Sequence, residues 1–479
     1  MRFSGGTPSG DLTYSDVFLV PGRSSVTSRL DVSLAPGDGT GATIPLVSSN
    51  MNSVTGPRLA AALARRGGLG VLPQDMPLQS LDAAIRWVKE QPVAFSGALT
   101  ADPSTTVEQA LAILPAVEGH GFVVQDAGGA VLGCVPASRL ATALPDALLG
   151  DLVHHAAPSI DADDVTTGRA AFDLMVEAGL DFAPVLHHGA LVGTLSRTGA
   201  LRSTIYDPAL DADGRLRVAA AVGINGDVAA KARALVAAGV DVLVLDTAHG
   251  HQEAMLRALR TVSALDLGVP IAAGNIVTAE AVQDLVEAGA SILKVGVGPG
   301  AMCTTRMMTA VGRPQFSAVL ETAERARELG AHVWADGGVR YPRDVALALA
   351  AGASSVMVGS WFAGTIEAPG ELRTDAAGRV YKESWGMASA KAVQERFGRL
   401  DAYELARKRL FAEGISSSTI YLDPLRPSLE DLLDMITSGV RSSFTYAGAR
   451  SVAEFHERAV VGLQSASGYE EGKALPVSW

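Results

Sequence analysis

The chain has little cysteine, few aromatic residues and no long apolar run. It contains only two cysteines in 479 residues, Cys134 and Cys303, which excludes a disulfide framework and favours a reducing compartment. No apolar stretch reaches the length of about 18 residues that crosses a membrane, and the first residues, MRFSGGTPSGD, lack the apolar segment of a signal peptide. We therefore expect a cytoplasmic protein.

Positive charge is also scarce. The chain has 39 Lys and Arg residues against 51 Asp and Glu residues, a formal net charge of −12, and no basic block. These features disfavour binding to nucleic acid or to an anionic membrane, although they permit a local phosphate pocket. The hydrophobic content of 48% is enough for one large domain and a smaller one.

From residue 216 onward the sequence repeats one pattern: an apolar run, a Gly or Asp turn, and an amphipathic helix. Strands that are apolar throughout and alternate with helices are typical of a parallel sheet buried on both faces. The six apolar runs of this region lie at 219–224, 240–247, 270–275, 290–297, 332–338 and 354–360. Two similar units begin at 44–49 and 69–73. Eight such units predict an α/β fold, a (β/α)8 TIM barrel.

A long insertion separates the second predicted unit from the third. We expect residues 1–93 to form the first part of the barrel, 94–206 an inserted domain, and 207–479 the second part with a catalytic loop, a flap and a C-terminal segment. The insertion repeats itself, because GFVVQDAGGAVLGCVPASRL (121–140) resembles FAPVLHHGALVGTLSRTGAL (182–201). This repeat resembles a pair of CBS motifs, a Bateman module, which implies binding of ATP- or GTP-type nucleotides. A structural spacer without a ligand is the alternative.

Polar residues follow the predicted strands, where a TIM barrel places its active site. The loops after the seventh and eighth strands, Asp336-Gly337-Gly338 and Gly359-Ser360, suit a phosphate because glycine exposes backbone N–H groups. The other strand ends carry Ser48, Ser49, Asn50, Asp246, His249, Asn275 and the loop GVGPGAMCTT. His249 and His251 alone make an incomplete metal site, and the start of a helix explains their polarity.

Cys303 lies in this glycine-rich loop at the predicted rim of the barrel. A thiol there can be exposed and activated, whereas a cysteine without such surroundings usually packs as a small hydrophobic residue. Thr305 is a poor base by itself, but its hydroxyl can relay a proton if a carboxylate lies behind it. Cys134 lies on a predicted strand of the insertion, where we expect packing.

Six motifs occur in an order and spacing that resemble one enzyme family. They are LTYSDVFLVP (12–21), SSNMNSVTGPRLA (48–60), AAGNIVT (272–278), VGVGPGAMCTTR (295–306), ADGGVR (335–340) and WGMAS (385–389). Together they resemble the IMP dehydrogenase/GMP reductase family, over nearly the whole chain and including the CBS insertion. The resemblance implies a nucleotide-binding barrel in which the loop cysteine adds to C2 of the purine of a nucleoside monophosphate.

The resemblance also implies roles for individual residues. Cys303 matches the nucleophile, Thr305 the proton relay and Glu413 the acid behind it. Asp336 matches the residue that holds the ribose hydroxyls, and Asp246 and Asn275 match positions near the nicotinamide riboside. The implied substrate contacts further include Ser49, Met51, Gly338, Gly359, Ser360, Gly386 and Met387. The carbonyls of Gly298, Gly300 and Cys303 match a site for a monovalent cation, K+ in our interpretation.

Two reactions of this family share the cysteine intermediate. A dehydrogenase oxidises IMP with NAD and then needs an Arg-Tyr pair on a flap to activate water. The corresponding position here is Arg399-Leu400, without the tyrosine, and Arg396-Phe397 is out of register. A reductase expels ammonia from GMP with NADPH, and Glu413 acting through Thr305 is able to protonate the leaving amine.

Asn50 also follows the reductase pattern, whereas the CBS motifs and WFAGTIEAPGE favour a dehydrogenase. We expect a GMP reductase of purine salvage, with IMP dehydrogenase as the alternative and a catalytically poor nucleotide sensor as a third possibility.

Three departures from the family pattern bear on phosphate binding: Ala301 replaces a serine, Ser384 stands near the place of a tyrosine, and Asn52 replaces an aspartate. The resemblance implies a homotetramer, or an octamer formed through the CBS motifs.

Overall fold

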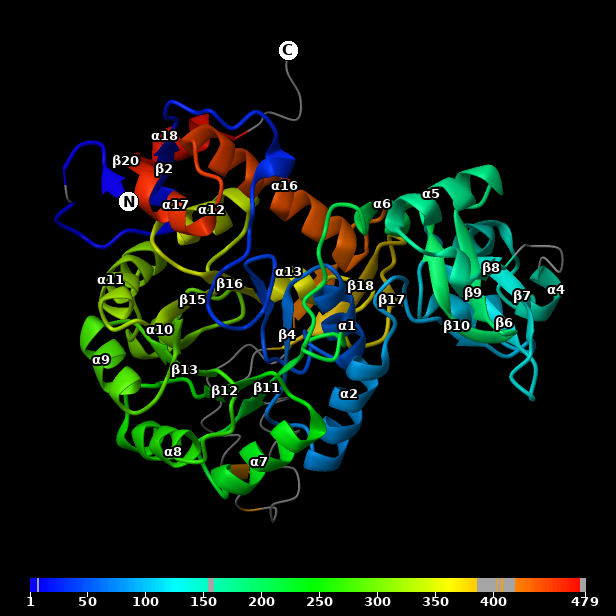
Figure 1. Cartoon of the computed structure of the whole chain (residues 1–479), viewed down its shortest axis with the longest axis horizontal. Helices are drawn as coiled ribbons and strands as arrows, with labels where there is room; N and C mark the ends of the chain where they lie inside the picture. Colours follow the sequence, from blue (N-terminus) through cyan, green and yellow to red (C-terminus); the bar gives the residue numbers. More distant parts are fainter. Residues whose placement is uncertain (7, 154–158, 386–402, 404–405, 408–417, 474–479) are drawn as a thin grey trace.

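The computed structural model describes all residues except 7, 154–158, 386–402, 404–405, 408–417 and 474–479. Its centre is a closed barrel of eight parallel strands in the order β11-β12-β13-β14-β15-β16-β3-β4 (Figure 1). The strands are β3 (Leu46–Ser48), β4 (Leu69–Leu72), β11 (Ala219–Val222), β12 (Val242–Asp246), β13 (Ile271–Ile276), β14 (Ile292–Val295), β15 (His332–Asp336) and β16 (Ser355–Val358). The predicted TIM barrel is confirmed.

The strands are largely apolar because they separate two cores. Alternate residues point into the barrel and form one buried cluster around Trp334, which includes Val47, Val71, Val244 and Met357. The residues between them, such as Leu243 and Leu245 on β12, join a larger cluster with the surrounding helices. Successive residues of each strand therefore belong to different cores. A polar side chain on either face needs a partner, because both faces are buried.

Helices cover the outside of the barrel. They are α1 (Pro57–Arg65), α2 (Leu78–Glu90), α7 (Val228–Ala238), α8 (Glu253–Ser263), α9 (Ala279–Glu287), α11 (Gln315–Glu328), α12 (Pro342–Ala350) and α16 (Leu429–Ala447). The short helices α10 (Thr305–Thr309) and α13 (Ser360–Ala363) follow β14 and β16. The helix α16 packs on both α12 and α1 and so completes the outer ring. Ser428 and Asp431 form a capping box at its start, and Gly448 ends it in a left-handed conformation.

The two ends of the described chain meet beside the barrel. The strand β20 (Val460–Leu463) pairs with β1 (Arg2–Phe3) on one side and with β2 (Val17–Val20) on the other. Figure 1 shows this sheet next to α12 and α17 (Val452–Arg458). The remaining short elements there are η1 (Tyr14–Asp16), η2 (Arg29–Asp31) and α18 (Ala466–Glu471).

Between α2 and β11 the chain leaves the barrel and forms two three-stranded sheets at one side of the molecule (Figure 1). The first half contains β5 (Thr100–Ala101), α3 (Val107–Leu111), β6 (Gly121–Gln125), β7 (Val131–Pro136), η3 (Ala137–Thr142) and α4 (Leu149–Leu152). The second contains β8 (Ile160–Asp161), η4 (Ala162–Asp164), α5 (Gly168–Glu177), β9 (Phe182–His187), β10 (Ala190–Ser196) and α6 (Arg197–Arg202). Both halves show the strand, turn and strand that the repeated sequence predicts.

A small antiparallel sheet, β17 (Arg373–Thr374), β18 (Val380–Ser384) and β19 (Ser418–Tyr421), lies between β16 and α16 in the sequence. The predicted flap, with Gly386, Met387 and Glu413, falls between β18 and β19 and outside the described residues. Among the helices that the structure describes, none has the length and apolarity needed to cross a membrane.

A buried ionic network joins the insertion to the barrel. Arg202, the last residue of α6, donates to the carboxylates of Glu430, Asp431 and Asp434 at the start of α16. The Arg66 guanidinium donates to Glu430 over 2.8 Å. Burial alone raises the pKa of Glu430, but the positive charges of Arg66 and Arg202 outweigh it and lower that pKa to about 2. The carboxylate is therefore charged at neutral pH.

We predict that Glu430→Gln lowers the free energy of unfolding by about 3 kcal/mol at pH 7, because it leaves buried arginine charge uncompensated. The measurement is urea unfolding. Asp82→Asn is the control, since it breaks an exposed ion pair with Arg86 and should leave the midpoint unchanged. Because the folded pKa of Glu430 lies below the unfolded value of about 4.3, its contribution is lost as the pH falls from about 4.3 towards 2. A difference between wild type and variant that stays constant over this pH range would contradict the assignment.

Candidate active site

The carboxyl ends of the barrel strands enclose a pocket of ≈ 420 Å³. It is lined by parts of the loops that follow β3, β12, β14, β15 and β16. Nine residues singled out from the sequence line it together: Ser49, Met51, Gly300, Cys303, Thr305, Asp336, Gly338, Gly359 and Ser360. Asp246 and Asn275 lie at neighbouring strand ends. Asn275 hydrogen-bonds to Asp336, and Asp246 and Asp336 both pair with Lys294. Gly298 lies two residues before Gly300 in the same loop.

Cys303 is exposed, and its thiol is directed to Thr305. The Sγ atom donates to Thr305 Oγ1 over 3.2 Å. The Cys303 N–H donates to the Gly300 carbonyl over 3.0 Å, which closes a turn just before α10. The thiol proton thus already has an acceptor, and the Thr305 hydroxyl can pass a proton onward.

Glycine is required in the loop that carries the thiol. Gly296 has φ +150°, and a Cβ atom there would lie 2.1 Å from the Asp336 carbonyl oxygen. Gly298 has φ +83°, and a Cβ atom there would lie 2.2 Å from Arg306 Cγ. The loop after β14 therefore packs directly on the end of β15, which brings Cys303 and Asp336 into one pocket.

A lysine that the sequence analysis missed lies under this pocket. Lys294 on β14 is only 4% exposed. Its Nζ atom contacts Asp246 Oδ1 at 2.8 Å and Asp336 Oδ2 at 2.6 Å. Burial alone lowers the pKa of Lys294, but the two carboxylates outweigh it and raise the pKa above its usual range. The only signal in the sequence was one charged residue inside the apolar run ILKV.

Two asparagines extend the same network. Asn275 Nδ2 donates to Asp336 Oδ2 over 2.9 Å and to the Gly296 carbonyl. Asn50 Nδ2 donates to Asp246 Oδ2 over 3.0 Å. In the described part of the chain, Ser49 Oγ and Asn275 Oδ1 are buried without a hydrogen-bond partner. Buried polar atoms of this kind usually have one, so both are candidates for contacts with a ligand.

The family departures lie in different surroundings. Ala301 lines the pocket. Ser384 is buried, and its Oγ atom lies 3.0 Å from Ser53 Oγ, outside the set of residues that line the pocket. Ser384, which stands near the place of a tyrosine in the family pattern, therefore contacts another side chain of the chain itself.

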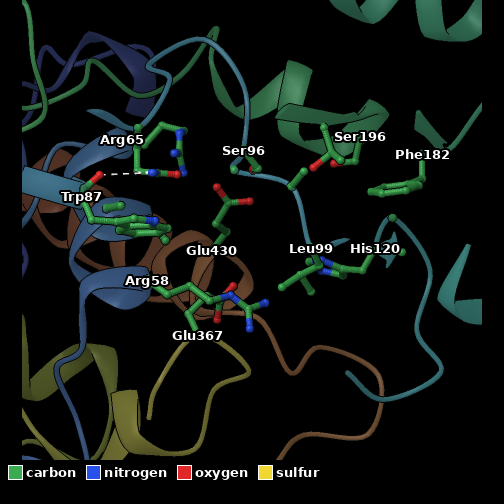
Figure 2. A pocket seen from close by; sticks show the side chains of 18 residues that line it. Arg58, Arg65, Trp87, Ser96, Leu99, His120, Phe182, Ser196, Glu367 and Glu430 are labelled. Atoms are coloured by element: carbon green, nitrogen blue, oxygen red, sulfur yellow. Dashed lines mark hydrogen bonds between the residues drawn. The ribbon is translucent and has the colours of Figure 1, made fainter. Parts of the chain in front are cut away.

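A second cavity, of ≈ 130 Å³, lies where the barrel meets the insertion (Figure 2). Figure 2 shows Arg58, Arg65 and Trp87 from the barrel helices facing it, opposite His120, Phe182 and Ser196 of the insertion. Glu367 and Glu430 also line it, but both oxygens of each carboxylate already accept hydrogen bonds from elsewhere in the chain. Burial is the main cause that lowers the pKa of Arg65 to about 10.

The model of the IMP dehydrogenase / GMP reductase domain matches residues 11–474. The chain belongs to this family. It is 55% identical to a protein named GMP reductase from Mycobacterium tuberculosis, over 100% of both chains. It is 36% identical to the inosine-5'-monophosphate dehydrogenase of Aquifex aeolicus, over 96% of this chain and 94% of that one. Among solved structures, a GMP reductase variant from Trypanosoma brucei in complex with guanosine 5'-monophosphate is similar with a TM-score of 0.69 and 31% identity, over 99% of both chains.

We predict that iodoacetamide modifies Cys303 in the native protein and leaves Cys134 unmodified. Cys303 is exposed, whereas Cys134 is buried and burial raises the pKa of its thiol. Peptide mass spectrometry measures the modification at each site. Both cysteines should react in guanidinium chloride. Modification of Cys134 at the rate of Cys303 without denaturant would contradict the structure.

Proposed function

We propose that this chain is a GMP reductase that converts GMP and NADPH to IMP, ammonia and NADP+ in purine salvage. One observation carries the proposal: an exposed thiol, hydrogen-bonded to Thr305, lies in one pocket with Asp336 and the glycine-rich ends of β15 and β16. The choice of reductase over dehydrogenase is supported by 55% identity to proteins named GMP reductase, against 36–37% to dehydrogenases.

The pocket suits a nucleoside monophosphate. Asp336 accepts hydrogen bonds from the ribose hydroxyls, and Gly338, Gly359 and Ser360 supply N–H and O–H donors to the phosphate. Met51 lies against the base, and Ser49 Oγ, buried and without a partner among the described residues, is free for a polar contact with the ligand. Gly386 and Met387, the other two proposed base contacts, lie outside the described residues.

In the proposed chemistry the Cys303 thiol passes its proton to Thr305 and the sulfur attacks C2 of the purine. The new C–S bond replaces the bond to the 2-amino group, which leaves as ammonia after it gains a proton. Glu413, outside the described residues, is the proposed source of that proton, which Thr305 delivers to the amine, and the proton from the thiol passes through Thr305 to replace it on Glu413. NADPH supplies the hydride that replaces sulfur at C2. The electron pair of the C–S bond then returns to the Cys303 thiolate.

Asp246 and Asn275 are the proposed contacts on the cofactor side. The unpartnered Asn275 Oδ1 fits this role because it can accept a hydrogen bond from an amide group such as that of nicotinamide. For the monovalent cation, the carbonyls of Gly298, Gly300 and Cys303 come from one loop and are oxygen donors of the kind that K+ prefers. The Gly300 carbonyl already accepts one hydrogen bond from the Cys303 N–H, and its second lone pair is available to an ion.

We propose in addition that the insertion is a CBS pair that binds ATP- or GTP-type nucleotides. The cavity in Figure 2, with Arg58, Arg65 and the Trp87 ring, offers cationic and aromatic groups that suit such a ligand. Assembly as a homotetramer, or as an octamer through the insertions, and a cytoplasmic location complete the proposal.

The proposed activity is tested by incubating the purified protein with GMP and NADPH, and separately with IMP and NAD, while the absorbance of the reduced cofactor is followed. We expect NADPH oxidation with GMP and no reduction of NAD with IMP. Cys303→Ala should lower kcat by at least about a thousandfold, and Thr305→Ala by about a hundredfold. Reduction of NAD with IMP alone would assign the dehydrogenase reaction, and nucleotide binding without either turnover would assign the sensor.

A further inference from the structure

The carboxylates of Asp246 and Asp336 face one ammonium group from two sides. Both contact Lys294 Nζ, so their nearest oxygens lie at most about 5.4 Å apart, the total of the two contact distances. Two carboxylates at such a distance repel each other, and one of them normally takes up a proton to relieve the repulsion. The side chain of Lys294 is buried, and Lys294 is not among the residues that line the pocket.

We propose that Lys294 is a positioning residue that keeps Asp246 and Asp336 ionised at the same time. Asp336 then holds the ribose of the substrate while Asp246 contacts the cofactor. This inference rests on the proposed function, in which Asp336 binds the ribose and Asp246 lies on the cofactor side. Lys294 itself does not contact the reacting atoms.

The remaining groups around the pair support this role. Asn50 and Asn275, which hydrogen-bond the two carboxylates from β3 and β13, are neutral and cannot replace the positive charge. Among the described residues, the other titratable groups that line the pocket are the Cys303 thiol and the Arg340 guanidinium. Neither has an ion pair with Asp246 or Asp336. Loss of Lys294 therefore leaves two like charges without a counterion.

The other end of the same barrel provides a matched control. Lys89 is also buried and also contacts two carboxylates, Asp211 at 2.9 Å and Asp241 at 2.7 Å. Asp241 immediately precedes β12, the strand that ends at Asp246. Lys89→Met therefore removes an equivalent buried charge from the opposite end of the barrel and leaves the pocket intact.

The test is the affinity for GMP without cofactor, measured by calorimetry between pH 6 and pH 9. Lys294→Met should weaken GMP binding by about tenfold at pH 6, because one carboxylate is then protonated. The deficit relative to the wild type should shrink as the pH rises, since higher pH ionises both carboxylates again. Lys89→Met should destabilise the fold and leave GMP affinity within about twofold at every pH.

A double variant separates charge from packing. Lys294→Met combined with Asp246→Asn removes the repulsion, so it should bind GMP at pH 6 at least about threefold more tightly than Lys294→Met alone. If Lys294→Met does not fold, Lys294→Gln and its combination with Asp246→Asn carry the same comparison.

A deficit that is equal at all pH values, or a double variant that binds no better than the single one, would overturn the inference. The same holds if both single variants and the double variant fail to fold while Lys89→Met folds, because Lys294 would then be structural. A wild-type protein that does not bind GMP would instead remove the proposed function.

Discussion

The like charge of Asp246 and Asp336 is the constraint on which the rest of this pocket depends. The two carboxylates end strands that lie on either side of β13 and β14, and the closed barrel turns both towards its centre. The ammonium group of Lys294 compensates both charges, because it is buried and contacts both carboxylates. A lysine inside the barrel wall is tolerated because each of its partners is charged, as buried charge requires. Lys294 thus allows two charged strand ends to lie next to an apolar barrel interior.

The glycine-rich loop follows from the same geometry. The strand β14, which carries Lys294, pairs with β15, and the chain after β14 passes directly over the end of β15. Gly296 permits this passage because any side chain there would overlap the Asp336 carbonyl. The loop then reaches Cys303 and Thr305 with the thiol exposed and directed to the hydroxyl. The position of the thiol is therefore set by how closely two strand ends approach.

Much of this was predictable, and the reason is that its signals are local. Apolar runs and the helices between them indicated all eight barrel strands, and the internal repeat indicated the two halves of the insertion. Polar residues after each run indicated the pocket. Lys294 escaped notice because a single lysine does not reveal its partners, which lie 48 residues before it and 42 residues after it. The contact between the Ser384 and Ser53 hydroxyls also has no local signal, because the two residues are 331 positions apart in the sequence.

The contacts around α16 connect the insertion to the pocket through few residues. Glu430 at the start of this helix is held by Arg66 and Arg202, and thus by both the barrel and the insertion. The two residues before it, Ser428 and Leu429, donate to Glu367, which lies seven residues after Ser360 of the pocket lining. Because buried ion pairs and capping bonds have few alternative arrangements, a rotation of the insertion has to break them or carry the start of α16 with it. The same helix start follows β19, the strand that closes the segment carrying Glu413. A change in the orientation of the insertion therefore acts first on the start of α16 and on Glu367, which accepts hydrogen bonds from it.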